Sequence, residues 1–213
     1  MRTLENQADL AEAVTRLVTV EPCFAAIVAS HGLPPLRRME AGLAGLLRII
    51  TDQLISLQAG AAIWRRIEAE LAPFDAANIA RKREASLMRL GLSGAKARSF
   101  KAVAAAVATG QLDFDRLGQL PDAQVLEALM ALHGIGPWTA DIFLLSAMGR
   151  ADAWPVGDLA LQVAAQHLFG LAGRPGHQHM RELAEPWRPW RAVAARLLWS
   201  HYRGLRGMSQ AIV

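Results

Sequence analysis

The chain contains a single cysteine, Cys23, among its 213 residues. A disulfide within the chain needs a second cysteine and a four-cysteine metal or iron–sulfur site needs more still, so the sequence excludes both. Lysine is almost as scarce: Lys82, Lys96 and Lys101 are the only ones, and arginine carries most of the basic charge. The net charge of +4 suits a polyanionic partner, but charge alone leaves it open whether that partner is a nucleic acid.

Long apolar runs and strand patterns are absent as well. No run is long and uncharged enough to span a bilayer, and residues 1–5 lack the apolar stretch of a secretory signal, so a cytoplasmic protein is expected. No stretch shows the apolar–polar alternation of a β-strand, and no turn dipeptide joins two β-branched runs into a hairpin. Because 53% of the residues are hydrophobic, the chain can bury a core, and the expected fold is all-α.

Apolar residues recur at helical spacing through most of the chain. Two examples are residues 9–20 and the largely buried pattern at 43–55. Serines stand where two helices should begin, since Ser56 follows the second pattern and Ser93 lies in the turn at 91–96. That turn either connects two helices or adds a phosphate contact.

Residues 132–140 read Leu-His-Gly-Ile-Gly-Pro-Trp-Thr-Ala and join two helical patterns. Pro137 suits the first position of a helix, so Gly134 and Gly136 form a tight turn that leads into it. Backbone N–H groups at the start of a helix have no partner within it, and glycines without a Cβ let a phosphate come close. One helix and one loop later stands Asp158, in a segment with few charges. Taken alone, an aspartate at that place is an ordinary helix N-cap.

Together these stretches resemble the helix-hairpin-helix superfamily of DNA glycosylases, and within it 3-methyladenine DNA glycosylase II. The segments that carry the resemblance, within about residues 5–205, are Asp52-Gln53-Leu54-Ile55-Ser56, the hairpin at 134–140, Trp187-Arg188-Pro189-Trp190-Arg191, and Trp199. Asp52 replaces a glycine of the family. A lone Gly-x-Gly is weak evidence, whereas four ordered motifs in one helical chain are strong. The family's N-terminal β-domain has no counterpart here, which implies a compact form.

The resemblance implies an all-α fold of two lobes with an active-site cleft between them. The lobe that contains the helix-hairpin-helix would be 41–150. The second lobe would be discontinuous and would combine 1–40 with 151–213.

Members of this superfamily act in base excision repair, where they flip a damaged base out of the duplex and break its N-glycosidic bond. The resemblance makes Asp158 the catalytic residue, because a carboxylate stabilises the positive charge that develops on the sugar. Trp138 occupies the position where lyases of the superfamily carry a lysine, and tryptophan cannot form a Schiff base. A monofunctional hydrolase is therefore expected, with alkylated purines such as 3-methyladenine and 7-methylguanine as substrates.

The resemblance also implies the DNA contacts. Leu54 would be the wedge that fills the gap left by the flipped base, and Trp138 and Trp199 would form the base pocket, where indole faces suit a cationic base. Core packing remains the alternative for all three, since leucine and tryptophan are often buried. Further residues implied to bind DNA are Gln53, Ser56, His133, Gly134, Gly136 and Thr139.

The implied partner is double-stranded DNA with damaged bases, bound by a monomer in the cytoplasm at the nucleoid, with no membrane. No metal site and no required cofactor are expected, although a monovalent cation at the hairpin backbone fits the resemblance. Two alternatives stay open. One is a glycosylase of the same fold for uracil or oxidised guanine, and the other is a non-catalytic DNA-binding hairpin protein.

Overall fold

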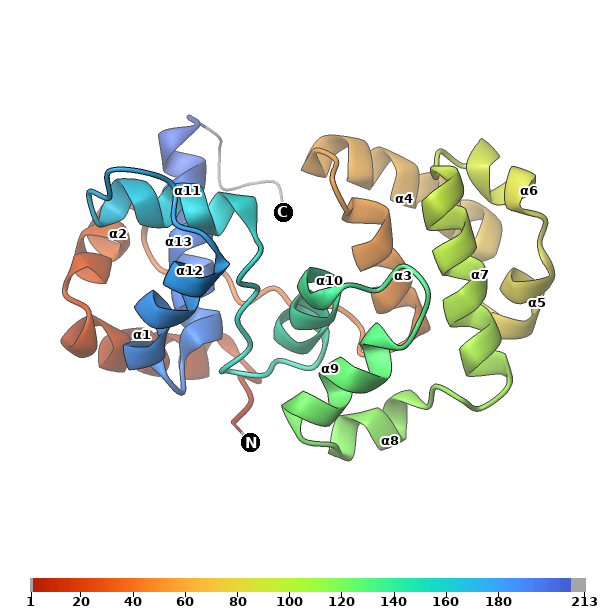
Figure 1. Cartoon of the computed structure of the whole chain (residues 1–213), viewed down its shortest axis with the longest axis horizontal. Coiled ribbons are helices and arrows are strands. Elements are labelled where there is room, and N and C mark those ends of the chain that lie inside the picture. Colours follow the sequence, from red (N-terminus) through yellow and green to blue (C-terminus); the bar gives the residue numbers. More distant parts are fainter. Residues whose placement is uncertain (1, 208–213) are drawn as a thin grey trace. The chain divides into compact units, whose positions relative to one another are not determined.

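The computed structural model describes residues 2–207 and folds them into helices, with no β-strand in that range (Figure 1). An isolated antiparallel bridge joins Thr3 to Arg150. The all-α prediction is therefore confirmed. No helix within the described range is both long and apolar enough to cross a membrane.

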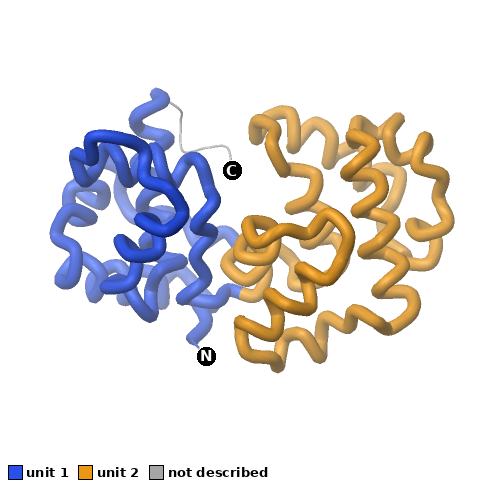
Figure 2. Tube along the Cα trace, viewed as in Figure 1, with its two compact units in different colours: residues 1–38, 149–213 blue, residues 39–148 orange. Residues whose placement is uncertain are grey.

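The chain divides into two compact units (Figure 2). The first is discontinuous and combines 1–38 with 149–213, while the second is the continuous stretch 39–148. The boundaries expected from the sequence were 41 and 150. The chain thus leaves the first unit after Arg38 and returns to it at Gly149.

The first unit is built around its last helix. Its elements are α1 (Gln7–Val20), α2 (Cys23–His31), α11 (Leu159–Leu168), α12 (His177–Ala184), the 3-10 turn η2 (Glu185–Trp187) and α13 (Arg191–Leu205). Helix α13 packs against α1, α2 and α11, and its alanine-rich face is buried. Trp187 fills the core beside it, with its ring edge-on to Phe24 at a centroid distance of 5.1 Å. This core carries α11, whose N-cap is Asp158.

The second unit is built around α7. Its elements are α3 (Leu43–Asp52), α4 (Leu57–Leu71), α5 (Ala76–Arg81), α6 (Glu84–Arg89), α7 (Gly94–Ala108), α8 (Phe114–Gln119), α9 (Asp122–Met130), α10 (Pro137–Ile142) and the π-helical turn η1 (Phe143–Ala147). Helix α7 packs against α3, α5 and α6. Small buried residues such as Ala97 and Ala104 let the neighbouring helices approach closely. Helix α3 contributes large apolar side chains to this core, and its Leu46, Leu47 and Ile50 are fully buried.

Helix boundaries follow the capping residues. Ser56 accepts a hydrogen bond from the Ala59 N–H at 3.2 Å, and Ser93 accepts one from the Lys96 N–H at 3.3 Å. Pro137 is the first residue of α10. These predicted helix starts are confirmed. The predicted end of the helix at 43–55 is wrong, because α3 stops at Asp52.

Three histidines meet where α2, α11 and α13 of the first unit pack together. His167 Nδ1 lies 3.0 Å from His201 Nε2, and the ring centroids of His31 and His201 are 6.4 Å apart. Burial lowers the pKa of His201, and the nearby charges of His167 and His31 lower it further. The unfolded chain, with a histidine pKa of about 6.5, therefore binds a proton that the folded state resists.

We expect the free energy of unfolding to decline as the pH falls from 6.5 through the lowered pKa of His201, since stability present above 6.5 is lost on protonation. Urea unfolding between about pH 7.5 and about pH 5 measures this loss. In His201→Gln the acid-dependent decline should be shallower. His179→Gln, which alters an exposed histidine of α12, is the control and should keep the decline of the original protein. An identical decline in both variants would contradict the assignment to His201.

Candidate active site

A tight turn after α3 carries Leu54. The backbone leaves the helix at Gln53, and Leu54 adopts a left-handed conformation with φ of 56°. Its side chain is fully exposed, with a relative accessibility of 104%. The alternative that Leu54 belongs to the core is therefore wrong. Its role as a wedge stays a prediction.

Gln53 ties this turn to the hairpin between α9 and α10. Its Nε2 donates to Thr139 Oγ1 at 2.8 Å and to the carbonyl of Gly134 at 3.4 Å. Thr139 is buried, and its hydroxyl is the acceptor of the shorter bond. The structure thus brings together Gln53, Gly134 and Thr139, three of the residues implied to bind DNA. The side chains of Gln53 and Thr139 are hydrogen-bonded to each other. DNA contacts by Gln53, Thr139 or the exposed Ser56 stay predictions.

The two hairpin glycines have different reasons for lacking a side chain. Gly134 has φ of 81°, and a Cβ at that position would lie 1.8 Å from Ser99 Oγ on α7. Gly136 has φ of −98°, and a Cβ there would meet nothing within 4 Å. Gly134 is therefore required by the fold, because the left-handed backbone and the contact with α7 both exclude a side chain. Gly136 leaves open space in front of the backbone.

Other hairpin residues flank the two glycines. His133 is exposed at the hairpin, before Gly134. Trp138 is half-buried in the first turn of α10, directly after Pro137. Within the described range, no group of three or more histidine, cysteine, aspartate or glutamate side chains is arranged to hold a metal ion.

Asp158 is the N-cap of α11 in the first unit. Its Oδ1 accepts hydrogen bonds from the Leu161 N–H at 3.0 Å and from the Trp199 Nε1–H at 3.1 Å. The residue is buried, with 9% of its surface exposed. Its capping role is confirmed, and capping fixes the carboxylate against the helix start. Two donors on one oxygen also fix the orientation of the carboxylate plane.

Trp199 therefore has a partner that its sequence position did not indicate. It comes from α13, forty-one residues beyond Asp158, and its half-buried indole donates to the candidate catalytic carboxylate. The structure joins these two implied site residues inside one unit. A contact of the Trp199 ring with a flipped base stays a prediction.

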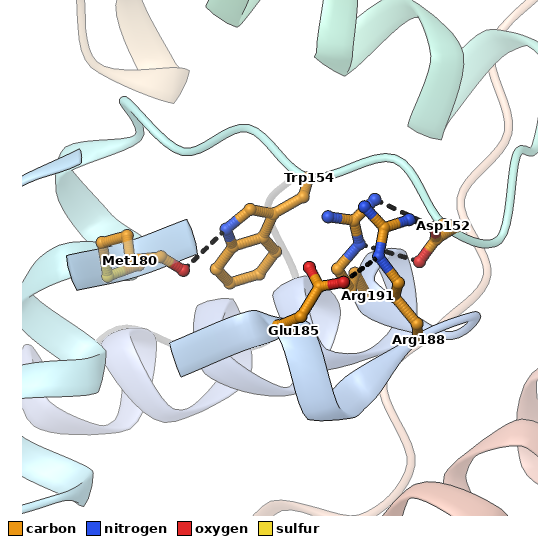
Figure 3. A network of polar contacts seen from close by, with 6 residues as sticks. All are labelled: Asp152, Trp154, Met180, Glu185, Arg188 and Arg191. Carbon is orange, nitrogen blue, oxygen red and sulfur yellow. Dashed lines mark hydrogen bonds and ion pairs between the residues drawn. The ribbon is translucent and has the colours of Figure 1, made fainter. Parts of the chain in front are cut away.

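The loop that leads to Asp158 is anchored at two places (Figure 3). Asp152 accepts from Arg191 Nε at 2.8 Å and from Arg191 Nη2 at 2.9 Å, and Arg188 Nη1 also donates to it. Trp154 is buried, and its Nε1–H donates to the carbonyl of Met180 at 3.1 Å. Bidentate pairing and the buried indole together hold the loop in place ahead of α11.

Sequence reasoning missed Asp152 and Trp154 as supports of the site. A signal was present, since Arg188 and Arg191 lie in the motif that resembles the family, three residues apart, and arginines at that spacing can share one carboxylate. Nothing in the sequence indicated which acid they would pair with. Figure 3 shows both guanidinium groups turned toward Asp152.

Residues 47–189 match the model of the HhH-GPD superfamily, which is described as base excision DNA repair proteins. The match spans more than half of the chain. This chain belongs to the HhH-GPD superfamily. The helix-hairpin-helix resemblance is thereby confirmed. Leu54, the hairpin and Asp158 all lie inside the matched stretch, whereas Trp199 lies beyond it.

Several known proteins are similar to this HhH-GPD chain. An alkylbase DNA glycosidase-like protein of Schizosaccharomyces pombe is 26% identical over 160 residues, which cover 73% of this chain and 75% of that protein. A putative DNA-3-methyladenine glycosylase of Bacillus subtilis is 31% identical over 93 residues, which cover 44% of this chain. That match spans only 32% of the Bacillus subtilis protein, about a third of its length.

A solved structure agrees along nearly the whole HhH-GPD chain. The crystal structure of a DNA-3-methyladenine glycosidase from Bacillus halodurans has a TM-score of 0.75 and 27% sequence identity. The similarity covers 99% of this chain and 96% of that one. The likeness thus includes both units, and with them the elements that carry Leu54, the hairpin and Asp158.

Proposed function

We propose that this protein is a monofunctional DNA glycosylase that releases alkylated purines, such as 3-methyladenine and 7-methylguanine, from double-stranded DNA. The observation that carries the proposal is the buried carboxylate of Asp158, which Leu161 and Trp199 hold at the start of α11. Membership of a superfamily of base excision DNA repair proteins supports it, as do relatives named for DNA-3-methyladenine.

In the proposed reaction, the bond between C1′ of the sugar and the purine nitrogen breaks, and the base leaves with the electron pair. Positive charge develops on the sugar, and the negative carboxylate of Asp158 stabilises it. A water molecule then bonds to C1′ and releases a proton to the solvent. An alkylated purine that already carries a positive charge leaves as a neutral base, so the step needs no strong general acid.

The second unit supplies the proposed grip on DNA. Open space in front of Gly136 lets a phosphate approach the hairpin backbone, a contact that does not depend on base sequence. The exposed Leu54 enters the stack from its turn. The proposed hydrolysis needs no cofactor. A monovalent cation at the hairpin backbone, a monomeric state and a location at the nucleoid stay predictions.

The proposal is tested with a panel of matched duplexes that carry 3-methyladenine, 7-methylguanine, uracil or oxidised guanine. We expect release of the two alkylated purines, leaving an abasic site in an intact strand that breaks only after alkali. Borohydride should trap no covalent complex, because Trp138 stands where a lyase lysine would be.

Other outcomes on the same panel distinguish the alternatives. Release of uracil or oxidised guanine, with the alkylated purines untouched, would reassign the lesion within the same fold. Binding to all four duplexes without release of any base would identify a non-catalytic DNA-binding protein. Strand scission through a borohydride-trapped intermediate would overturn the monofunctional assignment.

A further inference from the structure

The carbonyl groups on both sides of Asp52, at the end of α3, share one partner. Lys96 Nζ donates to the carbonyl of Thr51 at 2.8 Å and to that of Gln53 at 2.7 Å. The last carbonyls of a helix have no partner inside it, and a cation placed there interacts favourably with the negative end of the helix dipole. Lys96 belongs to α7, so its side chain connects that helix to the residue directly before Leu54.

An ion pair also lies at this helix end. Asp52 Oδ2 accepts from Arg48 Nε at 2.8 Å, and the Arg48 guanidinium lies over the Trp64 ring at 5.5 Å from its centroid. The other oxygen, Asp52 Oδ1, packs against Gly60, where a Cβ would lie 2.1 Å away. Asp52 replaces a glycine of the family. Its side chain is only 18% exposed, so it faces inward rather than toward solvent.

Lys96 and Asp52 act on each other electrostatically. Burial lowers the pKa of the Lys96 ammonium, and the Asp52 carboxylate opposes that shift. The ammonium is thus held by two carbonyl oxygens of the turn and attracted by the Asp52 carboxylate. All these groups belong to the second unit.

We propose that Lys96 is a positioning residue for Leu54: its ammonium holds the end of α3, so that the turn keeps Leu54 exposed in its left-handed conformation. A leucine with φ of 56° is strained and has no contact of its own to hold it there. The turn must therefore be fixed from its flanks. Lys96 holds the backbone carbonyl of Gln53, the residue before Leu54. The side chain of Gln53 is held in turn by Thr139 of the hairpin.

This inference rests on the proposed function, because it assigns Lys96 to the action of Leu54 as a wedge. A direct contact between the Lys96 ammonium and a phosphate would require that charge to face DNA. Two of the three ammonium hydrogens are committed to carbonyl oxygens of α3, which favours the positioning role.

A double-mutant cycle tests the proposal. Lys96→Met keeps the aliphatic stem and removes the donors, and single-turnover release of 7-methylguanine should become about 10-fold slower because the wedge is misplaced. In the Leu54→Ala background, the same substitution should change the rate by less than about 2-fold. Lys96→Arg, which restores a charged donor, should recover part of the rate. Equal losses in both backgrounds would overturn the proposal.

Lys101→Met is the matched control. Lys101 lies on the same helix, and its Nζ donates to the carbonyl of Lys82, away from the turn. The Lys101→Met substitution removes the same charge and should leave the release rate within about 2-fold of the original protein's rate. If Lys96→Met reduced the salt dependence of duplex binding while Lys101→Met did not, Lys96 would be a phosphate contact and the positioning role would be wrong.

Amide hydrogen exchange of the free protein separates this proposal from the proposed function. In Lys96→Met the peptide that spans residues 53–57 should exchange about 10-fold faster, with α7 and the control variant unchanged. Unchanged exchange would overturn the positioning role even if alkylated bases are released. Failure of the original protein to release any base, with faster exchange in the variant, would instead overturn the proposed function and the link to a wedge.

Discussion

Asp158→Asn is expected to slow release of alkylated bases by about 1,000-fold while folding and duplex binding are retained. The amide oxygen of asparagine can still accept from the Leu161 N–H and the Trp199 indole, and asparagine is as good an N-cap as aspartate. Only the negative charge is lost. The measurement is single-turnover release of 7-methylguanine, together with thermal unfolding and the affinity for an abasic-site duplex.

Asp113→Asn gives a control with the same chemistry. Asp113 caps α8 in the second unit by accepting from the N–H groups of Asp115 and Arg116. It should leave the rate unchanged, because at that helix the carboxylate serves only as a cap. An Asp158→Asn variant that released bases at the original rate would overturn the proposed mechanism. A variant that failed to fold would show that the charge itself is structural, and Asp158→Glu would then carry the test.

The reason for so large an expected loss is the position of the charge. Asp158 is buried, so water screens its carboxylate poorly, and a charge in such a site acts more strongly than one at the surface. Its orientation is fixed in advance by two donors, which lowers the cost of reorganisation in the transition state. Asp152 and Trp154 contribute by holding the loop that precedes it.

Gly134→Ala is expected to have the second largest effect, on both stability and DNA binding. The new Cβ would lie 1.8 Å from Ser99 Oγ and 2.9 Å from Ser99 Cβ, and φ of 81° disfavours any side chain. Relief of the clash requires the hairpin to move away from α7. We expect a loss of about 1–3 kcal/mol in the free energy of unfolding, measured by urea denaturation. Duplex binding should weaken in parallel, since the hairpin backbone is displaced.

Gly136→Ala separates the two effects. Its Cβ meets no atom within 4 Å and its φ is −98°, so stability should stay within about 0.5 kcal/mol of the original. The added methyl group would stand in the open space where a phosphate is proposed to approach, so duplex affinity should fall. Unchanged affinity in Gly136→Ala would contradict a phosphate contact at this glycine. Unchanged stability in Gly134→Ala would contradict the contact with Ser99.

The helices and their starts could be predicted because their causes are local. Ser56 and Ser93 cap helices through atoms three residues away, and Pro137 begins α10 because its fixed φ suits a first turn. Hydrophobic periodicity was enough to place α3. It was not enough to end that helix, since the apolar pattern continues through Leu54 and Ile55 although the helix stops at Asp52.

Pairings between distant residues could not be predicted. The sequence left Asp52 without an explanation, and the structure pairs it with Arg48 and packs it against Gly60. The pairing at a spacing of four residues was visible in principle, but the contact with Gly60 depends on how α4 returns past the end of α3. Lys96 gave still less indication, because its two acceptors lie more than forty residues earlier.

By itself the sequence determined the helical class, the caps, the hairpin with its two glycines and the presence of Asp158 downstream, since each follows from short-range geometry or from the identity of a residue. Only the tertiary structure decided that Leu54 is exposed, that Gly134 is required by contact with α7, and that Trp199 donates to Asp158. The physical reason is that a residue type and its spacing limit what a side chain can do. Which atoms it meets depends on helices that come together from far apart in the chain.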